Sequence, residues 1–354
     1  MNIINNLGFY IAVFTLAFCI SFIFTPIAKK LAFKLGAIAQ PRNRDMHSEP
    51  IPRLGGIAIV AGFLIPLLIL MPNVDVLDNM QMTGIIAGSS LIFILGILDD
   101  IYELSSKIKL FVQILAAIIA VSSGIIIDFI SLPFSNIFNL DFLAIPFTVV
   151  WIVGITNAVN LIDGLDGLAA GVSSIASICL MILSIHSGHP TAVILTVILA
   201  ASCLGFLPYN FNPASIFMGD TGSTFLGYIL SVISILGLLK GYALGTIFVA
   251  VLILGLPIFD TAFAILRRLL SGRPIMSPDR GHLHHRLVDR GYSHRHAVVT
   301  LYGISGIFGL SAMGLMLNDL RFILAVFIIM GILFYYNSRI NSLHTNERNK
   351  KLNP

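Results

Sequence analysis

The sequence predicts an all-α integral membrane protein, a polytopic bundle of about 11 transmembrane helices. Apolar residues make up 57% of the 354-residue chain and charged residues only 11%, against about a quarter in soluble domains. The mean hydropathy of +0.94 excludes a soluble globular fold, a disordered chain and a nucleic-acid reader. Because each helical span needs about 20 apolar residues, the spans use most of the chain and leave no room for a separate soluble domain.

Apolar runs between polar breaks place the individual spans. In chain order they cover residues 7–28, 54–71, 83–98, 109–127, 143–159, 168–187, 190–208, 223–239, 243–266, 297–317 and 320–337. The first run lacks a basic start and a small-residue cleavage site, so we expect a retained span and not a cleaved signal peptide. We expect one transmembrane domain over residues 1–337, a short outer hairpin between Asp128 and Asp141, and a polar cytoplasmic tail over residues 338–354.

The basic residues predict the orientation. If the N-terminus is outside, all 21 Lys and Arg residues except Lys240 and Arg321 fall in inner connections, at an inner helix end or in the C-terminal tail. The positive-inside rule therefore predicts an outer N-terminus and a cytoplasmic C-terminus. The inner connections with unusual polar residues are 99–108, 160–167, 209–222 and 267–296.

The first polar cluster is the pair Asp99-Asp100, which ends an apolar run and is followed by Lys107 and Lys109. Adjacent carboxylates at a helix C-terminus repel each other and face the negative end of the helix dipole. They therefore need a cation or another partner. A divalent metal ion and an ordinary interfacial cap are the two alternatives.

The second cluster consists of two amides and two carboxylates spaced three residues apart: Asn157, Asn160, Asp163 and Asp166. Steps of three place neighbours side by side on a helix, but three such steps rotate by about half a circle. All four can converge only if the backbone unwinds, which Gly164 and Gly167 permit.

The third cluster is the segment F-M-G-D-T-G-S, residues 217–223. Asp220 can ligate a hard cation, while Thr221 and Ser223 can cap the following helix. The segment is not a P-loop, because the G-K-[ST] ending is missing.

The fourth cluster places three histidines, His282, His284 and His285, between Arg280 and Arg286. Extended spacing puts His282 and His284 on one side and His285 on the other. Zinc is an alternative because histidine is its common ligand. However, the loop has no thiolate, and the carboxylates elsewhere favour magnesium or manganese. Histidines beside arginines suit an anionic phosphate.

Two further polar residues lie near the inner ends of spans. For Asp260, an ion pair with Arg267-Arg268 or a buried hydrogen bond competes with a catalytic role. Arg53 follows two prolines and could present its guanidinium to a lipid phosphate, or serve only as a positive-inside residue.

Inner-face carboxylates, a basic histidine loop and many apolar helices suit phosphoryl transfer from a cytosolic donor to a membrane-resident acceptor. A secondary transporter is the alternative of a different class. Transporters place ionisable sites near the midplane and commonly show internal repeats, whereas here the carboxylates crowd one face and no repeat is visible. A nonenzymatic lipid-binding protein would not require so many acids opposite lysines.

The chain resembles the polyprenyl-phosphate N-acetylhexosamine-1-phosphate transferases (glycosyltransferase family 4) in four ordered motifs. These are D-D with a downstream K-x-K, N-A-V-N-L-I-D-G-L-D-G-L-A-A-G, F-M-G-D-T-G-S and G-H-L-H-H-R, between about Pro50 and Arg286. The H-x-H-H-R loop and P-I-P-R-L-G-G are more similar to the WecA/TagO branch, which uses UDP-GlcNAc. The related MraY branch uses UDP-MurNAc-pentapeptide.

The resemblance implies transfer of GlcNAc-1-phosphate from UDP-GlcNAc to undecaprenyl phosphate with release of UMP, in the plasma membrane. This reaction would initiate a cell-envelope polysaccharide such as teichoic acid or O-antigen. Another UDP-N-acetylhexosamine, or UDP-MurNAc-pentapeptide, is the alternative donor. The resemblance also implies Mg²⁺, with Mn²⁺ as an alternative, and no nucleic-acid partner. It leaves the oligomeric state open, a homodimer included.

The resemblance also assigns roles to residues of the four motifs. The implied catalytic residues are Asp99, Asp100, His282 and His284. The implied metal ligands are Asp220 and Asn160. The implied substrate-binding residues are Arg53, Lys107, Lys109, Asn157, Asp163, Asp166, His285 and Arg286. Whether Asp100 abstracts a proton or forms a covalent intermediate stays open.

One position departs from the family's pattern. Relatives often carry a basic residue directly before the histidine of the first inner loop, whereas this chain reads Arg44-Asp45-Met46-His47. The acid argues against a phosphate contact at that position, and Arg44 or Arg53 could substitute for it.

Overall fold

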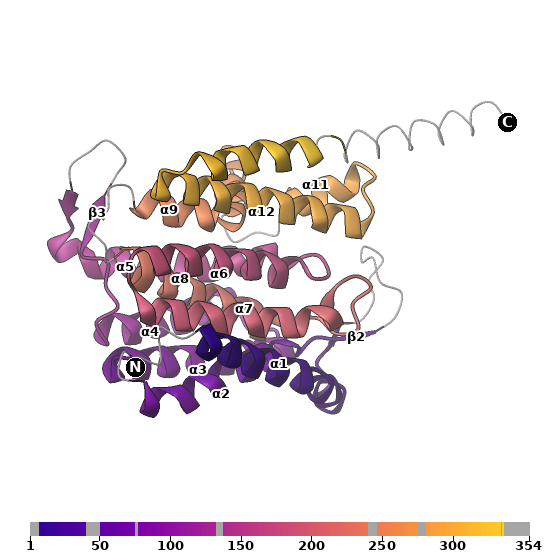
Figure 1. Cartoon of the computed structure of the whole chain (residues 1–354). Coiled ribbons are helices and arrows are strands. Elements are labelled where there is room, and N and C mark those ends of the chain that lie inside the picture. The colour runs from indigo at the N-terminus through magenta and orange to yellow at the C-terminus, as the bar shows by residue number, and fades with distance from the viewer. Residues whose placement is uncertain are drawn as a thin grey trace.

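The protein is an all-α bundle in which long helices lie side by side (Figure 1). The computed structural model describes residues 7–39, 50–74, 77–131, 137–239, 246–274, 281–333 and 335. The expected all-α membrane architecture is confirmed at this level, because apolar helices dominate every described range.

The helices follow the apolar runs of the sequence. They are α1 (Leu7–Leu35), α2 (Gly56–Leu70), α3 (Asn79–Tyr102), α4 (Ser106–Ser122), α5 (Ala144–Ile162), α6 (Leu168–His186), α7 (Pro190–Asn210), α8 (Gly219–Ser234), α9 (Thr246–Ile253), α10 (Gly255–Leu270), α11 (Leu283–Asp289) and α12 (His294–Leu317). A further apolar helix covers Leu320–Leu333. Short 3-10 turns cover Met71–Asn73 and Asp141–Leu143, and a π-helical turn, Ile235–Leu239, continues α8.

Within the described ranges, eight helices are long and apolar enough to cross a membrane, and a bent pair makes up to nine. The remaining two predicted spans correspond to α4 and to the helix Leu320–Leu333, which are shorter. A multi-pass protein is therefore confirmed, while the count of 11 and the orientation stay predictions.

The predicted span 243–266 is not one straight helix. It is broken between Ile253 and Gly255, and its two parts, α9 and α10, meet at 88°. Pro257 explains the new start, because proline lacks an N–H and is favoured in the first turn of a helix. The amide of Leu254 still donates to the carbonyl of Ala250 at 3.1 Å, so the break leaves this group hydrogen-bonded.

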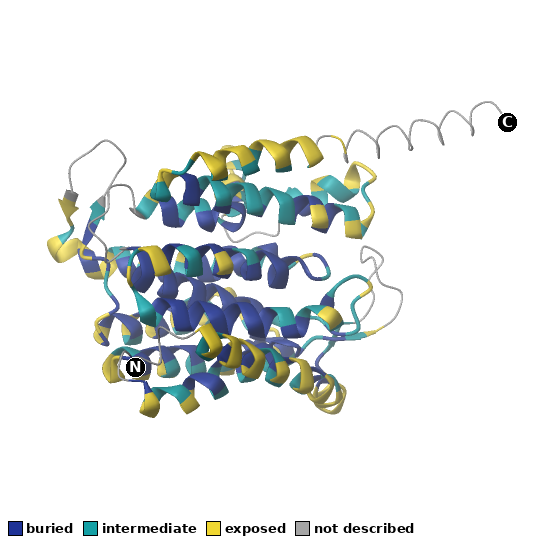
Figure 2. Cartoon of the chain, in the orientation of Figure 1, coloured by how far each residue is buried: buried dark blue, intermediate teal, exposed yellow. Residues whose placement is uncertain are grey.

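The helix α8 forms the centre of the bundle. Residues 221–238 of its span are all buried, whereas only 17% of the most apolar part of α1 is buried. The dark blue interior and yellow outer helices of Figure 2 show this difference. The helices α3 and α5 both pack on α8, and Gly96 of α3 lies directly against the backbone of Thr221. Small residues at such crossings let helix backbones approach closely.

Two small antiparallel pairs mark opposite ends of the bundle. Strands β3 (Phe129–Ser131) and β4 (Ile137–Asn139) form the expected hairpin, with Phe129 opposite Asn139. Strands β1 (Ile38–Ala39) and β2 (Ile51–Pro52) pair at the other end, where α11 also lies (Figure 1). The four polar clusters of the sequence belong to this second end.

Candidate active site

The site is built where the end of α3 meets the start of α8. Asp100 Oδ1 accepts a hydrogen bond from the Asp220 amide at 3.0 Å, and Asp100 Oδ2 accepts from the Thr221 amide at 2.9 Å and Thr221 Oγ1 at 2.6 Å. Met218, the residue before α8, supplies no side-chain cap. Asp100 therefore caps α8 from another helix, where a negative charge is stabilised by the helix dipole.

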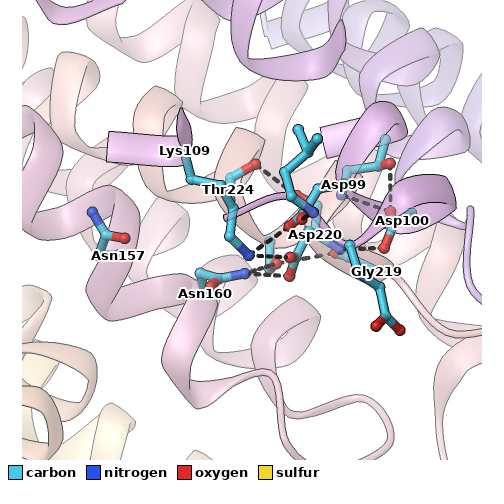
Figure 3. A network of polar contacts seen from close by, with 12 residues as sticks. Asp99, Asp100, Lys109, Asn157, Asn160, Gly219, Asp220 and Thr224 are labelled. Carbon is cyan, nitrogen blue, oxygen red and sulfur yellow. Dashed lines mark hydrogen bonds and ion pairs between the residues drawn. The ribbon is translucent and has the colours of Figure 1, made fainter. Parts of the chain in front are cut away.

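Lys109 of α4 lies between two carboxylates. Its Nζ is 2.6 Å from Asp99 Oδ2 and 3.1 Å from Asp220 Oδ2 (Figure 3). Asp99 Oδ1 also accepts from the Leu104 amide at 2.8 Å. The ammonium allows two carboxylates to stay close together, because opposite charge offsets their repulsion. The sequence predicted that Asp99 and Asp100 need a cation or another partner. Asp99 pairs with Lys109, and Asp100 accepts hydrogen bonds from the start of α8.

Asn160 holds the second oxygen of Asp220. Its Nδ2 donates to Asp220 Oδ1 at 2.7 Å and to Ser223 Oγ at 2.8 Å. A side-chain amide ligates a hard cation through its carbonyl oxygen, so the hydrogen bonds of Nδ2 do not prevent Asn160 from acting as a ligand. The predicted metal residues Asp220 and Asn160 are therefore brought together, with Asn160 orienting the carboxylate.

Asp163 lies just beyond α5, which ends at Ile162. Burial raises the pKa of Asp163 to about 8, and the nearby carboxylates of Asp220, Asp100 and Asp166 add to the effect. Among the residues that the structure describes, no side-chain hydrogen bond or ion pair is found for this carboxylate. A carboxylate in this position gains most from a cation, because a cation would stabilise its charged form.

The two amides and two carboxylates of the second cluster do not meet at one point. Asn157 Nδ2 donates to Gln113 Oε1 at 2.7 Å and lies apart from the acids in Figure 3. Because α5 stays helical through Ile162, Asn157 lies one turn before Asn160, where its amide meets Gln113 of α4 and not the acids.

Asp166 forms its own contacts. Its Oδ2 accepts from Asn212 Nδ2 at 2.9 Å and from the Ala214 amide at 3.0 Å, and its amide donates to His294 Nε2 at 2.8 Å. Asp166 thus ties the loop after α5 to the loop after α7 and to α12. The predicted substrate-binding roles of Asn157 and Asp166 stay predictions.

The histidine segment lies against α10. His282 Nδ1 is 2.8 Å from Asp260 Oδ2, and the Leu283 amide donates to Asp260 Oδ1 at 2.8 Å. The expected extended segment is wrong, because α11 begins at Leu283. The rings of His282 and His284 are stacked 5.7 Å apart with an interplanar angle of 8°, and the ring of His285 lies 4.2 Å from that of His284 and not on an opposite side. Asp260 therefore forms a buried hydrogen bond, with His282 as its partner and not the expected Arg267-Arg268 pair.

His284 connects this segment to the acidic cluster. Its imidazole lies over Gly164, in the space that a Cβ would fill, next to Asp163. Burial, and then the positive charge of His285, lower the pKa of His284 to about 3. His284 is therefore a neutral imidazole at physiological pH, suited to hydrogen bonding and not to ion pairing.

Arg286 and Arg267 line a cavity of about 300 Å³ beside α10. Asp260 also lines it, and its other walls are mostly apolar and include Phe259, Phe263 and Phe308. A cavity with arginines and apolar walls suits an amphipathic phosphate. Arg280 and His47 lie outside the described residues.

Arg53 supports the site from the first inner connection. Its Nε donates to the Asp100 carbonyl at 3.0 Å, and its NH2 group is 3.5 Å from Glu103 Oε1. A cation here stabilises the C-terminus of α3. Lys107, in contrast, is exposed to solvent.

Several functional relationships were not predicted from the sequence: the capping of α8 by Asp100, the Asp260–His282 pair, and the contact of His284 with Gly164. The capping of α8 by Asp100 had a signal in the G-D-T-G-S segment. The residue before this helix, Met218, cannot cap it, so the first amides of the helix need an acceptor from another part of the chain. The other two join residues far apart in the sequence, for which spacing gives no signal.

A membrane-embedded bundle with buried carboxylates, a bridging lysine and a histidine segment at one end defines an enzyme that acts on phosphorylated substrates at the membrane. The model of the family described as glycosyl transferase family 4 matches residues 82–238. The "Probable undecaprenyl-phosphate N-acetylglucosaminyl 1-phosphate transferase" of Bacillus subtilis is 45% identical over 314 residues, 88% of this chain and 86% of that protein. This chain belongs to glycosyl transferase family 4, the polyprenyl-phosphate N-acetylhexosamine-1-phosphate transferases.

Other relatives share most of their length with this chain. The "Decaprenyl-phosphate N-acetylglucosaminephosphotransferase" of Mycolicibacterium smegmatis is 35% identical, over 83% of this chain and 79% of that protein. The "Phospho-N-acetylmuramoyl-pentapeptide-transferase" of Staphylococcus aureus is 32% identical, over 83% of this chain and 96% of that protein. The family therefore includes proteins named for two different donors.

Proposed function

We propose that this enzyme transfers GlcNAc-1-phosphate from UDP-GlcNAc to undecaprenyl phosphate and releases UMP. The observation that carries the proposal is the cluster of Asp99, Lys109 and Asp220, with the histidine segment reaching it through the Asp163–Gly164 turn. The 45% identity to a protein named for this reaction supports the choice of donor and acceptor.

The reaction replaces one phosphorus–oxygen bond by another. An oxygen of the lipid phosphate attacks the sugar-linked phosphorus, and the bond from that phosphorus to the bridging oxygen breaks, so that UMP leaves with that oxygen. The sugar C1–O bond stays intact. A phosphate monoester with a second pKa near 6 is already largely a dianion at neutral pH. Positioning and electrostatic stabilisation are therefore the larger contributions.

The acidic cluster fits Mg²⁺ by its donor chemistry, because hard cations prefer oxygen ligands. In the described part of the chain, no three His, Cys, Asp or Glu side chains form a closed metal site. Mg²⁺ is usually held by one or two carboxylates plus substrate phosphates and water, and Asp220 and Asp163 provide such a pair. When bound, the ion would neutralise charge on the donor diphosphate.

Side chains of the protein provide the remaining contributions to positioning and charge stabilisation. Asp100 fixes the start of α8 and so the position of Asp220, while Lys109 offers a positive charge to phosphate oxygens next to Asp99. His284 offers a neutral ring nitrogen beside the Asp163–Gly164 turn. The cavity beside α10, with Arg267 and Arg286, suits the phosphate end of a polyprenyl acceptor. The site faces the cytoplasm, as the distribution of basic residues predicts.

The test uses the full chain purified in detergent and measures UMP release. UDP-GlcNAc, UDP-GalNAc and UDP-MurNAc-pentapeptide are compared as donors, with undecaprenyl phosphate present or omitted. We expect acceptor-dependent UMP release with UDP-GlcNAc that stops on addition of EDTA and returns with Mg²⁺ or Mn²⁺. Turnover with UDP-MurNAc-pentapeptide alone would contradict the proposed donor, and turnover that survives EDTA would contradict the metal.

A further inference from the structure

The pair formed by Asp260 and His282 is buried and joins two separate elements. Asp260 lies on α10, and His282 is the residue that precedes α11. The side chains are 8% and 6% exposed. Both lie outside the segment 82–238 that the family model matches.

Asp260 makes two contacts with the start of the histidine segment. One carboxylate oxygen faces His282 Nδ1, and the other accepts from the Leu283 amide, both at 2.8 Å. A carboxylate only accepts hydrogen bonds, so this geometry requires the proton on Nδ1 of His282. In a neutral imidazole, this tautomer leaves Nε2 as the nitrogen that can accept a hydrogen bond from another group.

The same contacts fix the position of the next histidine. The ring of His284 stacks on that of His282 and lies over Gly164, beside Asp163. The helix α10 that carries Asp260 begins at the 88° break and also packs against α5, which leads into that turn. A continuous series of contacts therefore runs from α10 through His282 and His284 to the acidic cluster.

We propose that Asp260 is a positioning residue of the transferase, which holds His282 in the Nδ1-protonated form and holds the histidine segment against the Asp163–Gly164 turn. The inference rests on the proposed function, because it assigns Asp260 a part in the same reaction. Asp260 also lines the cavity beside α10, but its two carboxylate oxygens face His282 Nδ1 and the Leu283 amide, so it acts through His282. Removing the outer partner of a metal-ligating histidine typically costs about 10- to 100-fold in metal affinity or activity, and we expect an effect of this size on kcat for Asp260.

The main variant is Asp260→Asn, which keeps the size of the side chain. An amide can donate to His282 Nδ1 and thereby favour the opposite tautomer. The matched control is Asp78→Asn, because Asp78 also accepts a backbone amide at a helix start, that of Met80 at 3.0 Å. Asn caps a helix about as well as Asp, so this control should keep wild-type kinetics.

The experiment measures kcat and the KM of both substrates for wild type, Asp260→Asn, His282→Gln and the double variant in detergent. We expect Asp260→Asn to lower kcat about 10- to 100-fold, with KM for UDP-GlcNAc and for undecaprenyl phosphate within threefold of wild type. The double variant should lose no more activity than His282→Gln alone, because both changes disable the same imidazole. Thermal midpoints, measured in parallel, should agree within a few degrees.

Three results would overturn the inference: wild-type kcat in Asp260→Asn, losses in the two single variants that multiply in the double variant, or a loss of kcat that accompanies a collapsed thermal midpoint. As a second measurement, ¹⁵N spectra of ring-labelled histidine should show a protonated Nδ1 at His282 in wild type and not in Asp260→Asn. If wild type and Asp78→Asn release no UMP, the proposed function fails, and the inference that rests on it fails as well. If wild type releases UMP and Asp260→Asn has the same kcat, the inference about Asp260 is overturned while the proposed function stands.

Discussion

Asp100 and Thr221 are joined by two hydrogen bonds to one carboxylate oxygen. Asp100 Oδ2 accepts from the Thr221 amide at 2.9 Å and from Thr221 Oγ1 at 2.6 Å. The two residues are 121 positions apart in the chain. These bonds join the end of α3 to the start of α8, and the two helix ends carry Asp99, Asp100 and Asp220.

The Thr221→Val variant should lower kcat by about 10- to 160-fold, because it removes a charge-assisted hydrogen bond of about 1.5 to 3 kcal/mol. Asp100 would keep its two backbone donors, so the protein should still fold. UMP release in detergent and the thermal midpoint measure the two effects. Thr196→Val is the matched control, since Thr196 is a buried hydroxyl that bonds only within α7. An equal loss of kcat in Thr221→Val and Thr196→Val would argue that the hydrogen bond from Thr221 Oγ1 does not contribute to the position of Asp100.

The Gly164→Ala variant should abolish most activity, because the added methyl group would occupy the place of the His284 imidazole. The ring would have to move away from the Asp163–Gly164 turn. Gly154→Ala is the control, since a Cβ at Gly154 of α5 meets no atom within 4 Å. In a helix interior, that change should even stabilise the protein by about 0.5 to 1 kcal/mol. Kinetics of UMP release for both variants test this contrast, and full activity of Gly164→Ala would separate His284 from the site.

The Asp220→Asn variant should reduce Mg²⁺-dependent UMP release by about 100-fold or more, since a lost cation removes several kcal/mol of charge stabilisation. A titration with Mg²⁺ should show a weaker apparent affinity in any residual activity. Asp319→Asn provides the control, because Asp319 forms its ion pair with the exposed Arg321. An unchanged Mg²⁺ titration in Asp220→Asn would remove Asp220 from the metal site.

His284 should make the protein less stable in acid. Its pKa is lowered to about 3 in the folded protein by burial and then by His285, against about 6.5 in an unfolded chain. Between these values the unfolded state binds a proton that the folded state does not, so stability is fully present above pH 6.5 and falls as the pH decreases. At pH 5 the loss is about 2 kcal/mol.

The His284→Gln variant, which cannot titrate, tests this pH dependence. Thermal midpoints in detergent at pH 7 and pH 5 should fall less for this variant than for wild type. His186→Gln removes an exposed histidine at the end of α6 and should retain the wild-type pH dependence. Identical pH dependence of wild type and His284→Gln would contradict the burial effect.

The sequence predicted the helices well and their internal break poorly. Every predicted apolar run has a helix in the described ranges, because about 20 apolar residues signal a span almost regardless of context. The break between Ile253 and Gly255 was missed, because the whole stretch is apolar and hydropathy carries no information on the direction of the helix axis. Pro257 was a local signal for a new helix start, although prolines inside α1, α2 and α7 leave those helices continuous.

The site residues were predicted by type, but their partners were not. Asp99, Lys109, Asn160 and Asp220 do meet, as the clustering of polar residues at one face indicated. Spacing along α5 could not tell that Asn157 faces Gln113. Asp260 was expected near Arg267-Arg268 in the same helix, because a single sequence predicts contacts only between residues that are close along the chain. Its partner His282 comes from a different element and is fixed by tertiary packing.

The right-angle turn between α9 and α10 has a consequence for how the protein meets lipid. The eight residues of α9 extend only about 12 Å, whereas the hydrocarbon layer is about 30 Å thick. Two segments that meet at 88° cannot both follow the membrane normal. At least one of them is therefore strongly tilted away from the membrane normal, so its residues cover little of the bilayer depth. Changes in bilayer thickness would then tilt the long helices but leave the depth of that segment almost unaltered.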